Sequence, residues 1–384
     1  MSTSGRHRPK ADGLRQATGS PQELSVFGLG PKGEYRNVQH EGTPMSPPHA
    51  AGGATAQARR GAGPTGPSVL IVKTSSMGDV VHALPALSDM LRHGPPGLQV
   101  DWLVEAPFAA IPRLHPGVRR VLPLSWRRWR RQLLSRATWT AMGALRDDLR
   151  RERYELVLDL QGLLKSALWG LQARGPLAGF DRHSAREPLA ALSYALSARV
   201  PLALHAVQRC RWLAAAHLGY VLPTTPPDFG LRPPAAGWAG PQPYAVLIPN
   251  ASRPEKLWPQ AHWEAVGRQL RDRGWTPVVL WGSETEQTLA ERIAAGCDGA
   301  VPPFLKVDAM AGLLAGARHV VGLDTGFTHL AAALGRPTIG IYCDHEPGLA
   351  GVTGPGLVAS LGGKGQVPAL RELLTLLDQQ MAAG

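Results

Sequence analysis

Asp79 is a candidate catalytic residue in this 384-residue chain because of the place it holds between two patterns. It ends the segment SSMGD (75–79), which follows the β-branched run VLIVKT (69–74) and precedes the helical pattern VVHALPALSDMLRH (80–93). A carboxylate in the first turn of a helix can cap the helix or complement its dipole. At the mouth of a cleft, the same carboxylate can act as a general base. The residues alone leave both interpretations open.

The segment PNASRPEKLWP (249–259) also follows a predicted strand. Ser252 can donate or accept a hydrogen bond there, and Lys256 supplies positive charge. Because ligands bind outside the carboxyl ends of strands in open α/β sheets, one interpretation of Lys256 is a phosphate contact. The other interpretation is a lysine that is merely solvated in its loop.

The segment GLDTGFTHLAAALG (322–335) runs from a strand into a helix that carries His329. The Thr325 hydroxyl and the Gly326 amide would form an anion cradle at the helix N-terminus, where glycine allows close approach. Asp324 would repel a diphosphate, so we expect it to bind a sugar hydroxyl or to orient the loop. The segment has no GxGxxG pattern, and GxxxxGK[ST] is absent from the chain, which argues against a dehydrogenase and a P-loop enzyme.

A fourth segment, SWRRWRRQLLSRATW (125–139), holds five arginines and three tryptophans. Arginine binds phosphate and carboxylate through two parallel hydrogen bonds, and tryptophan favours interfaces that are half apolar and half wet. The segment therefore fits an anionic membrane leaflet or an anionic glycolipid, with a solvated helix face as the alternative. The segment DRHSAREP (181–188) adds Arg186, and no nucleic-acid-binding motif accompanies either segment.

The charge of the chain is uneven. The formal net charge is +12, of which residues 68–235 carry +10 and residues 236–384 carry −2. One half of the protein is therefore expected to face an anionic partner. Three distant cysteines and isolated histidines match no disulfide or metal pattern, so we expect no metal, no cofactor and a reducing cytosol. No apolar run is long enough to span a bilayer, and the first residues lack the apolar core of a secretory signal.

Strands and helices alternate along most of the chain, which predicts an α/β fold with parallel sheets covered by helices. Predicted strands cover residues 69–74, 99–106, 118–124, 154–161, 244–250, 276–282, 319–324 and 337–343. Predicted helices cover residues 80–93, 140–153, 165–175, 262–274, 284–296, 308–317, 327–335 and 367–383. Seven prolines between Pro223 and Pro243 indicate a linker, so we expect two Rossmann-like domains facing a central cleft.

The expected domain boundaries follow from these patterns. Residues 1–67 are low-complexity sequence, expected to be disordered or to result from an upstream start codon. The N-terminal domain is expected over 68–230, the proline-rich linker over 231–243 and the C-terminal domain over 244–365, with a terminal helix within 366–384.

With these residues in place, the chain resembles the lipopolysaccharide heptosyltransferase family of ADP-heptose glycosyltransferases, and within it the heptosyltransferase I branch. The resemblance runs in order over residues 68–384 and rests on a set of matching stretches: VLIVKTSSMGDVVHALPAL (69–87), WRRWRR (126–131), LDLQGLLKSAL (158–168), SAREPLA (184–190), HAVQR (205–209), KLWPQAHW (256–263), GLDTGFTHLAAALGRPTIGIY (322–342) and PGLAGVTG (347–354). Each stretch is a weak signature by itself, but together they are specific.

The resemblance implies a GT-B fold and an inverting transfer of L-glycero-D-manno-heptose from ADP-heptose to the first Kdo of Kdo2-lipid A. It implies that Asp79 is the catalytic base. Donor contacts would come from Ser252, Lys256, Glu286, Leu305, Asp324, Thr325, Gly326 and His329. Acceptor contacts would come from Ser76, Gly78, Arg127, Arg128, Arg131, Lys165 and Arg186. The terminal helix would pack back toward the N-terminal domain, with capping of the C-terminal domain as the alternative.

The resemblance also implies a place and a partner surface. The enzyme would be cytoplasmic and peripheral on the cytoplasmic face of the inner membrane, bound to its anionic leaflet and to no nucleic acid. The stretch PNASR lacks the histidine that the family commonly has before the lysine, and Gln208 replaces the usual glutamate in HAVQR. A heptosyltransferase II acting on an already heptosylated acceptor is the alternative, followed by a nucleotide-sugar epimerase of the same fold.

Overall fold

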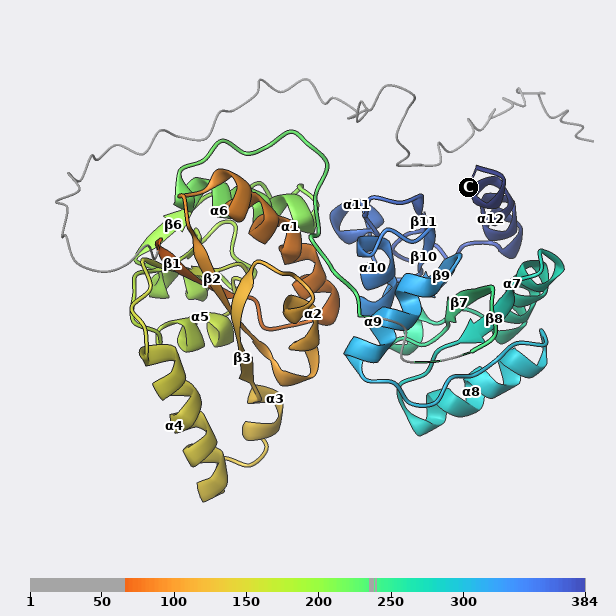
Figure 1. Cartoon of the computed structure of the whole chain (residues 1–384), viewed down its shortest axis with the longest axis horizontal. Helices are drawn as coiled ribbons and strands as arrows, with labels where there is room; N and C mark the ends of the chain where they lie inside the picture. Colours follow the sequence, from red (N-terminus) through yellow and green to blue (C-terminus); the bar gives the residue numbers. More distant parts are fainter. Residues whose placement is uncertain (1–65, 235–237, 239, 384) are drawn as a thin grey trace, which may run out of the picture.

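Two parallel β-sheets, each covered by helices on both faces, form the two halves of the molecule (Figure 1). The computed structural model describes residues 66–234, 238 and 240–383. The extension expected over residues 1–67 lies outside these residues except for its last two. We call residues 66–230 the N-terminal half and residues 244–383 the C-terminal half. The predicted α/β fold class is confirmed.

The N-terminal sheet has six strands in the order β3-β2-β1-β4-β5-β6, which is the Rossmann order. The strands are β1 (Ser68–Val72), β2 (Gln99–Glu105), β3 (Val118–Leu124), β4 (Leu156–Asp159), β5 (Leu177–Phe180) and β6 (Leu196–Ala198). The strand order reverses between β1 and β4, which pair in parallel. A crevice for ligands is expected outside the carboxyl ends of these two strands.

Alternate side chains of β1 enter two different apolar cores, as strand geometry requires. Val69 and Ile71 pack with α1 (Met77–His93), α2 (Ala110–Arg113) and α6 (Ala206–Leu218). Leu70 and Val72 pack with α3 (Trp126–Trp129), α4 (Arg136–Arg150) and α5 (Leu164–Gly170). Two short 3₁₀ helices, η1 (Ala106–Phe108) and η2 (Pro188–Ser193), lie in the connections.

The C-terminal sheet has five strands in the order β11-β10-β9-β7-β8. The strands are β7 (Tyr244–Ile248), β8 (Thr276–Val279), β9 (Val320–Leu323), β10 (Thr338–Tyr342) and β11 (Val358–Gly362). Counted from β8, the order is β8-β7-β9-β10-β11, which is the flavodoxin-like order. The direction of the strand order reverses between the neighbouring strands β7 and β9. The short helices η3 (Pro254–Lys256) and α11 (Pro347–Ala350) follow β7 and β10. The crevice of this half is therefore expected beyond the ends of β7 and β9.

One face of the C-terminal sheet is covered by α9 (Val307–Gly316) and α10 (Gly326–Ala333), and the other by α7 (Gln260–Asp272), α8 (Glu284–Ala295) and α12 (Leu370–Ala383). The expectation that the terminal helix packs back toward the N-terminal half is wrong. Leu373 and Leu377 of α12 are buried in the core beneath α7 and α8, and the Trp258 indole donates to the Pro368 carbonyl. These apolar contacts hold α12 on its own half, where it caps the sheet.

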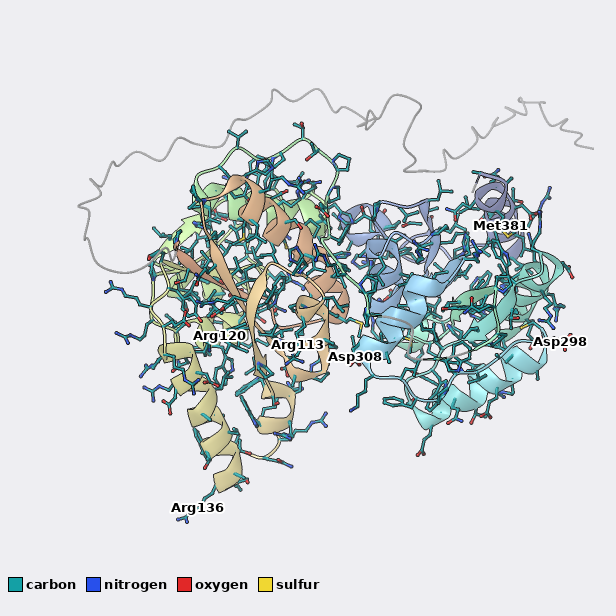
Figure 2. The ribbon with its side chains drawn as sticks, viewed as in Figure 1. Arg113, Arg120, Arg136, Asp298, Asp308 and Met381 are labelled. Carbon is teal, nitrogen blue, oxygen red and sulfur yellow. The ribbon has the colours of Figure 1, made fainter. Side chains whose placement is uncertain are left out.

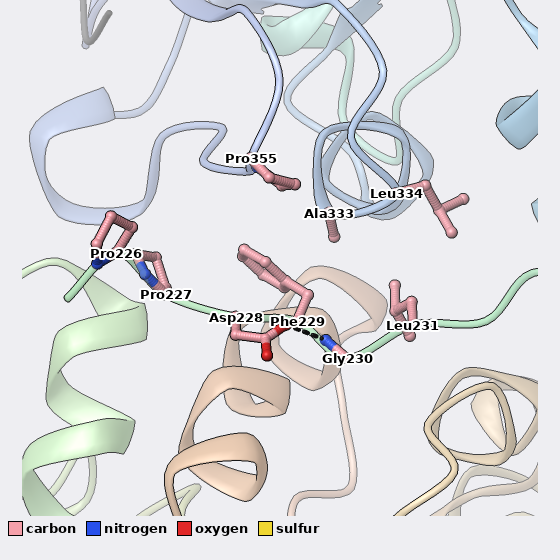
Figure 3. A pocket seen from close by; sticks show the side chains of 9 residues that line it. All are labelled: Pro226, Pro227, Asp228, Phe229, Gly230, Leu231, Ala333, Leu334 and Pro355. Atoms are coloured by element: carbon pink, nitrogen blue, oxygen red, sulfur yellow. Dashed lines mark hydrogen bonds between the residues drawn. The ribbon is translucent and has the colours of Figure 1, made fainter. Parts of the chain in front are cut away.

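The two halves share a single apolar core. Val80 and Leu84 of α1 belong to the same buried cluster as Leu330 of α10 and Met310 of α9. Helix α1 contacts α10, and α2 contacts α9. The segment that connects the halves adds Phe229. Its buried ring points from this segment toward the end of α10 near Ala333 (Figure 3). The halves therefore meet through packed apolar side chains.

Several elements were not predicted. Strands β5, β6 and β11 and helix α6 fall in segments whose apolar spacing is too short or too irregular to distinguish. The predicted helix at 165–175 is shorter, since α5 ends at Gly170. Within the part of the chain that the structure describes, no helix has the length and apolar character needed to cross a membrane.

Candidate active site

Asp79 lies in the first turn of α1, just beyond the carboxyl end of β1. The backbone N–H and the hydroxyl of Ser76 both donate to its Oδ2, each at 2.9 Å. Its Oδ1 faces two cations, Arg186 Nη1 at 3.3 Å and Lys73 Nζ at 3.9 Å. Both interpretations of Asp79 thus have a physical basis, because one oxygen closes the helix end and the other faces the cations.

The environment of Asp79 keeps its side chain ionised. Burial raises the pKa of this carboxyl, but Lys73, Arg186 and the Ser76 hydrogen bonds together lower it below its ordinary value. About a quarter of the side chain remains exposed. At neutral pH, Asp79 is therefore a carboxylate that can only accept hydrogen bonds or a proton.

Gln161, two residues after the end of β4, holds the turn in front of Asp79. Its Oε1 accepts from the Thr74 N–H at 2.7 Å and from the Thr74 hydroxyl at 2.8 Å, and its Nε2 donates to the Ser75 carbonyl. Lys165 of α5 donates to the Ser75 hydroxyl at 2.8 Å. Residues that follow β1 and β4 therefore meet at the point where the strand order reverses.

Three of these side chains were not singled out from the sequence. Lys73 and Gln161 both stand inside the matching stretches VLIVKTSSMGD and LDLQGLLKSA, which is the signal that could have found them. The third, Glu105 at the end of β2, is buried and accepts from the Arg127 backbone N–H at 3.3 Å. Burial raises the pKa of Glu105, and the nearby Arg127, Lys165 and Arg130 oppose this shift.

The predicted acceptor arginines fall into two groups. Arg186 contacts Asp79 directly, and Arg127 stacks its guanidinium 5.3 Å above the Phe108 ring beside Glu105. Arg128 and Arg131 are exposed on α3 and the turn after it. The structure therefore brings Arg186 and Lys165 to the turn that holds Ser75 and Asp79, and leaves Arg128 and Arg131 on the outer surface.

Lys256 and Asp324 form the centre of the second crevice, beyond the ends of β7 and β9. The Lys256 ammonium pairs with Asp324 Oδ2 and donates to the Asp324 backbone carbonyl at 3.2 Å. Asp324 Oδ1 lies 3.2 Å from His329 Nε2. Burial raises the pKa of Asp324, but His329 and Lys256 more than offset it, so that the net pKa lies well below the ordinary range.

The helix α10 begins immediately after Asp324, with Thr325 as the residue before its first turn. The Thr325 and Thr328 hydroxyls are 3.2 Å apart. A Cβ on Gly326 would lie 2.4 Å from the Cβ of Met77, the first residue of α1. Gly326 is therefore required for the close approach of the two helix N-termini.

The remaining predicted donor residues lie farther along the edge of the same sheet. Ser252 is exposed in the loop after β7. Glu286, in the first turn of α8, accepts from the Gly282 N–H at 2.7 Å, which closes that helix end. Leu305 is partly buried beside α9. Leu305 is next in the chain to Phe304, whose largely exposed ring packs against Trp281 with ring centroids 5.7 Å apart. This aromatic pair, which the sequence reading missed, is a surface on which a base could stack.

The N-termini of α1 and α10 meet across the boundary between the halves. A Cβ on Gly78 would lie 3.0 Å from the His329 ring, and His82 Nε2 lies 3.2 Å from His329 Nδ1. Gly78 therefore packs against His329, which is the hydrogen-bond partner of Asp324. Asp79 is the residue directly after Gly78, so its carboxylate lies next to this contact. The expectation of one carboxylate opposite one cationic cradle stays a prediction.

Among the residues that the structure describes, no group of three or more His, Cys, Asp and Glu side chains is arranged to hold a metal ion.

Comparison with known proteins gives consistent matches. The family model described as "Glycosyltransferase family 9 (heptosyltransferase)" matches residues 142–374. Lipopolysaccharide heptosyltransferase 1 of Pseudomonas aeruginosa is 45% identical over 289 residues, which are 74% of this chain and 81% of the relative. The structure of E. coli heptosyltransferase WaaC with ADP covers 82% of this chain and 99% of its own, at a TM-score of 0.75 and 38% identity. WaaC with ADP-2-deoxy-2-fluoro heptose gives a TM-score of 0.70, 37% identity and the same coverage.

Proposed function

The chain belongs to glycosyltransferase family 9, the heptosyltransferase family, and we propose that it moves L-glycero-D-manno-heptose from ADP-heptose to the first Kdo of Kdo2-lipid A with inversion. The two Rossmann-type sheets correspond to the GT-B fold of its structural relatives. One observation carries the proposal. The start of α1, which carries Asp79, packs against the start of α10, which follows Asp324 and its partner Lys256.

The donor would lie along the carboxyl ends of β7, β8 and β9. Lysine has three donor hydrogens, and Lys256 uses two on Asp324, which leaves one for a diphosphate oxygen. The amides at Thr325 and Gly326 would bind the same diphosphate, and the Trp281–Phe304 pair beside Leu305 would stack on the base. Glu286 would accept from a ribose hydroxyl, and Ser252 would contact a phosphate. The WaaC structures with ADP and with ADP-2-deoxy-2-fluoro heptose support this donor class.

The acceptor would lie against the turn between β1 and α1. Its anionic groups would bind Arg186, Lys165 and Arg127, and the backbone of Ser76 and Gly78 would border its sugar. Arg186 is half exposed, so it can turn from Asp79 to an acceptor carboxylate. That movement would expose Asp79 Oδ1 to the attacking hydroxyl.

The transfer would then proceed as a single displacement. The acceptor hydroxyl gives its proton to Asp79 while its oxygen forms a bond to the anomeric carbon. The bond from that carbon to the diphosphate breaks on the opposite face, which inverts the configuration and releases ADP. Lys256 and the α10 amides stabilise the charge that grows on the diphosphate, and such preorganised groups are a major source of rate enhancement.

The deciding experiment is product analysis. Purified protein is incubated with ADP-heptose and either Kdo2-lipid A or its heptosylated form, and products are identified by mass spectrometry. We expect the mass of one heptose to be added to Kdo2-lipid A, with ADP released only when acceptor is present. Transfer to the heptosylated form alone would indicate a heptosyltransferase II, and conversion of ADP-heptose without acceptor would indicate an epimerase.

A membrane-binding surface of the N-terminal half belongs to the same proposal. Leu164, Leu168 and Leu171 are exposed along one side of α5, at positions i, i+4 and i+7. Leu189 and Leu192 are exposed on η2, which contacts α5. We call these five residues the leucine surface. Exposed apolar side chains gathered in this way mark an interaction site.

The leucine surface continues into a basic region. Trp169 of α5 packs against Trp126 and Trp129 of α3, with ring centroids 6.4 and 5.6 Å apart. The exposed arginines of α3 and the turn after it therefore lie beside the leucines, and Arg136 stands at the outer tip of α4 (Figure 2). Leucines beside arginines match an anionic bilayer, where apolar side chains enter the acyl region and arginines bind the headgroups. Lys165 and Arg186 connect this surface to Asp79.

Vesicle binding tests this surface separately from catalysis. Leu168→Gln/Leu192→Gln is expected to weaken binding to phosphatidylglycerol vesicles about tenfold, because two fewer apolar side chains move from water into the bilayer. The matched control, Leu349→Gln/Val367→Gln, removes two exposed apolar side chains from the C-terminal half and is expected to bind as the wild type does. Unchanged vesicle binding of the first variant would contradict the leucine surface while leaving the transfer reaction untouched.

A further inference from the structure

A row of hydrogen-bonded side chains crosses the boundary between the halves. It begins with His82 in the second turn of α1 and continues through His329 of α10 to Asp324 and Lys256. Only His82 comes from the N-terminal half. The other three residues belong to the crevice in which the proposed donor would bind, and none of the steps assigned to that crevice uses His82.

The contacts orient the His329 ring. Asp324 is ionised and can only accept, so His329 Nε2 must carry a hydrogen and donate to it. The other ring nitrogen, Nδ1, lies 3.2 Å from His82 Nε2, and this contact holds the opposite side of the same ring. His82 therefore helps to keep Nε2 of His329 turned toward Asp324.

Burial makes this contact costly to lose. His82 and His329 are 4% and 5% exposed, so water cannot readily replace either ring. Burial lowers the pKa of His82 most, and the groups that face it lower it further: His329 of α10, His205 before α6, Lys73 after β1 and His345 after β10. His82 is therefore neutral at pH 7, with one ring nitrogen that donates and one that accepts.

We propose that His82 is a positioning residue that orients the donor-site carboxylate Asp324 through His329, so that the N-terminal half completes the donor site of the C-terminal half. The proposal rests on the donor-binding role given above to Asp324 and Lys256. Without His82, the His329 ring can rotate or change tautomer, and Asp324 no longer holds the Lys256 ammonium in one place. A well-placed ammonium matters most when charge develops on the leaving diphosphate, so the loss is expected in kcat.

A double-mutant cycle on heptose transfer tests the coupling. His82→Leu and His329→Leu are each expected to lower kcat about tenfold, with the acceptor KM changed less than twofold. The double variant is expected to be no slower than either single variant, because both substitutions break the same row. His82→Gln, which keeps a donor nitrogen at similar reach, is expected to recover most of the rate. Multiplication of the two effects to about a hundredfold would overturn the proposal.

The matched control is His217→Leu. His217 is also a hydrogen-bonded histidine of the N-terminal half, but its Nε2 contacts the Gly179 carbonyl, away from the boundary. It is expected to keep the wild-type kcat. A kcat loss in His217→Leu equal to that of His82→Leu would show that any partly buried histidine in this half has the same effect, and the proposal would fail.

Nuclear magnetic resonance separates this inference from the proposed function. In protein labelled with ¹⁵N-histidine, long-range ¹H–¹⁵N spectra distinguish protonated from bare ring nitrogens, and His329→Leu identifies the His329 signals. The wild type is expected to show a single His329 tautomer protonated at Nε2, and His82→Leu a mixture. An unchanged His329 spectrum would overturn the proposal. A changed spectrum in a protein without transferase activity would overturn the proposed function alone.

Discussion

The carboxylate of Asp79 divides its two oxygens between two tasks. Oδ2 accepts two hydrogen bonds from Ser76 and so fixes the start of α1, while Oδ1 faces Lys73 and Arg186. The capping contact holds the side chain in one orientation, which a general base needs in order to meet its substrate. At this position, helix capping supports the proposed catalytic role.

Asp79→Asn is expected to abolish most turnover. The amide can still accept from Ser76, so α1 should begin as before, but the side chain cannot take a proton. Loss of a general base typically lowers kcat by about 10²–10⁴-fold. ADP affinity, measured by calorimetry, is expected to stay within about threefold because ADP would bind the other half.

The control for Asp79 is Asp308→Asn, since Asp308 is a first-turn carboxylate of another helix, α9. It is expected to leave kcat unchanged. A near-normal rate for Asp79→Asn would remove this residue from the mechanism.

Lys256→Ala is expected to affect both binding and chemistry. The substitution removes the cation that pairs with Asp324 and the donor left for the diphosphate. Steady-state kinetics should show a higher KM for ADP-heptose and a fall in kcat of about 10²–10³-fold, the usual effect of losing one such donor. The exposed Lys364 of the same half is the control, and Lys364→Ala should change neither constant. A change confined to the acceptor KM would contradict the role of Lys256.

At the scale of elements, both crevices arise from the same topological rule. In each sheet, two neighbouring parallel strands have their connections on opposite faces, so the loops at their carboxyl ends diverge and leave a gap. Gln161 and the turn before Asp79 stand at the β1–β4 reversal, and Lys256 and Asp324 at the β7–β9 reversal. The helices α1 and α10, which start from these gaps, then meet at their N-termini.

Gly326→Ala tests that meeting point. The new Cβ would lie 2.4 Å from the Met77 Cβ, so one helix start must shift, and such overpacking typically costs about 1–3 kcal/mol. We expect a lower thermal midpoint together with a lower kcat. In α4, a Cβ on Gly143 meets no atom within 4 Å, and Gly143→Ala should be neutral or stabilising by up to about 1 kcal/mol. Equal effects of both substitutions on stability would contradict the packing described.

At the scale of the whole molecule, histidines connect the halves. Besides His82 and His329, His205 accepts from the Val207 N–H through Nδ1 and contacts the Gly351 carbonyl through Nε2 at 3.0 Å. Burial lowers the pKa of His205 to about 4. A protonated Nδ1 could no longer accept from Val207, so acid removes this hydrogen bond at the start of α6 and places a charge on a partly buried ring.

The pH dependence of stability follows from this pKa. The folded pKa of His205 lies below the unfolded value of about 6.5, so its contribution is complete above pH 6.5 and is lost as the pH falls toward 4. Between these values, the unfolded chain binds about one more proton, which amounts to about 1.4 kcal/mol per pH unit. Urea titrations at pH 7 and pH 5 should show a smaller acid loss of unfolding free energy for His205→Gln than for the wild type.

His183→Gln removes an exposed histidine of the same half and should lose as much stability in acid as the wild type. Identical losses for the wild type and His205→Gln would show that His205 does not titrate in this way.

The sequence alone determined most elements of the fold and most candidate residues of the site. Parallel strands buried on both faces appear as short apolar runs, and the residues that follow them are the ones that line a ligand crevice. That local logic singled out Asp79, Lys256 and Asp324. The matching stretches then pointed to the family, which the comparisons confirm.

The tertiary structure decided what depends on residues far apart in the chain. Strand order, the contact of His82 with His329 and the placement of α12 on its own half are set by packing between distant segments, on which local spacing carries no information. The leucines of α5 look like core residues in the sequence, and only the fold shows that no element covers them among the described residues. Local composition specifies elements, whereas the free energy of packing selects which of their faces meet and which stay open to a partner.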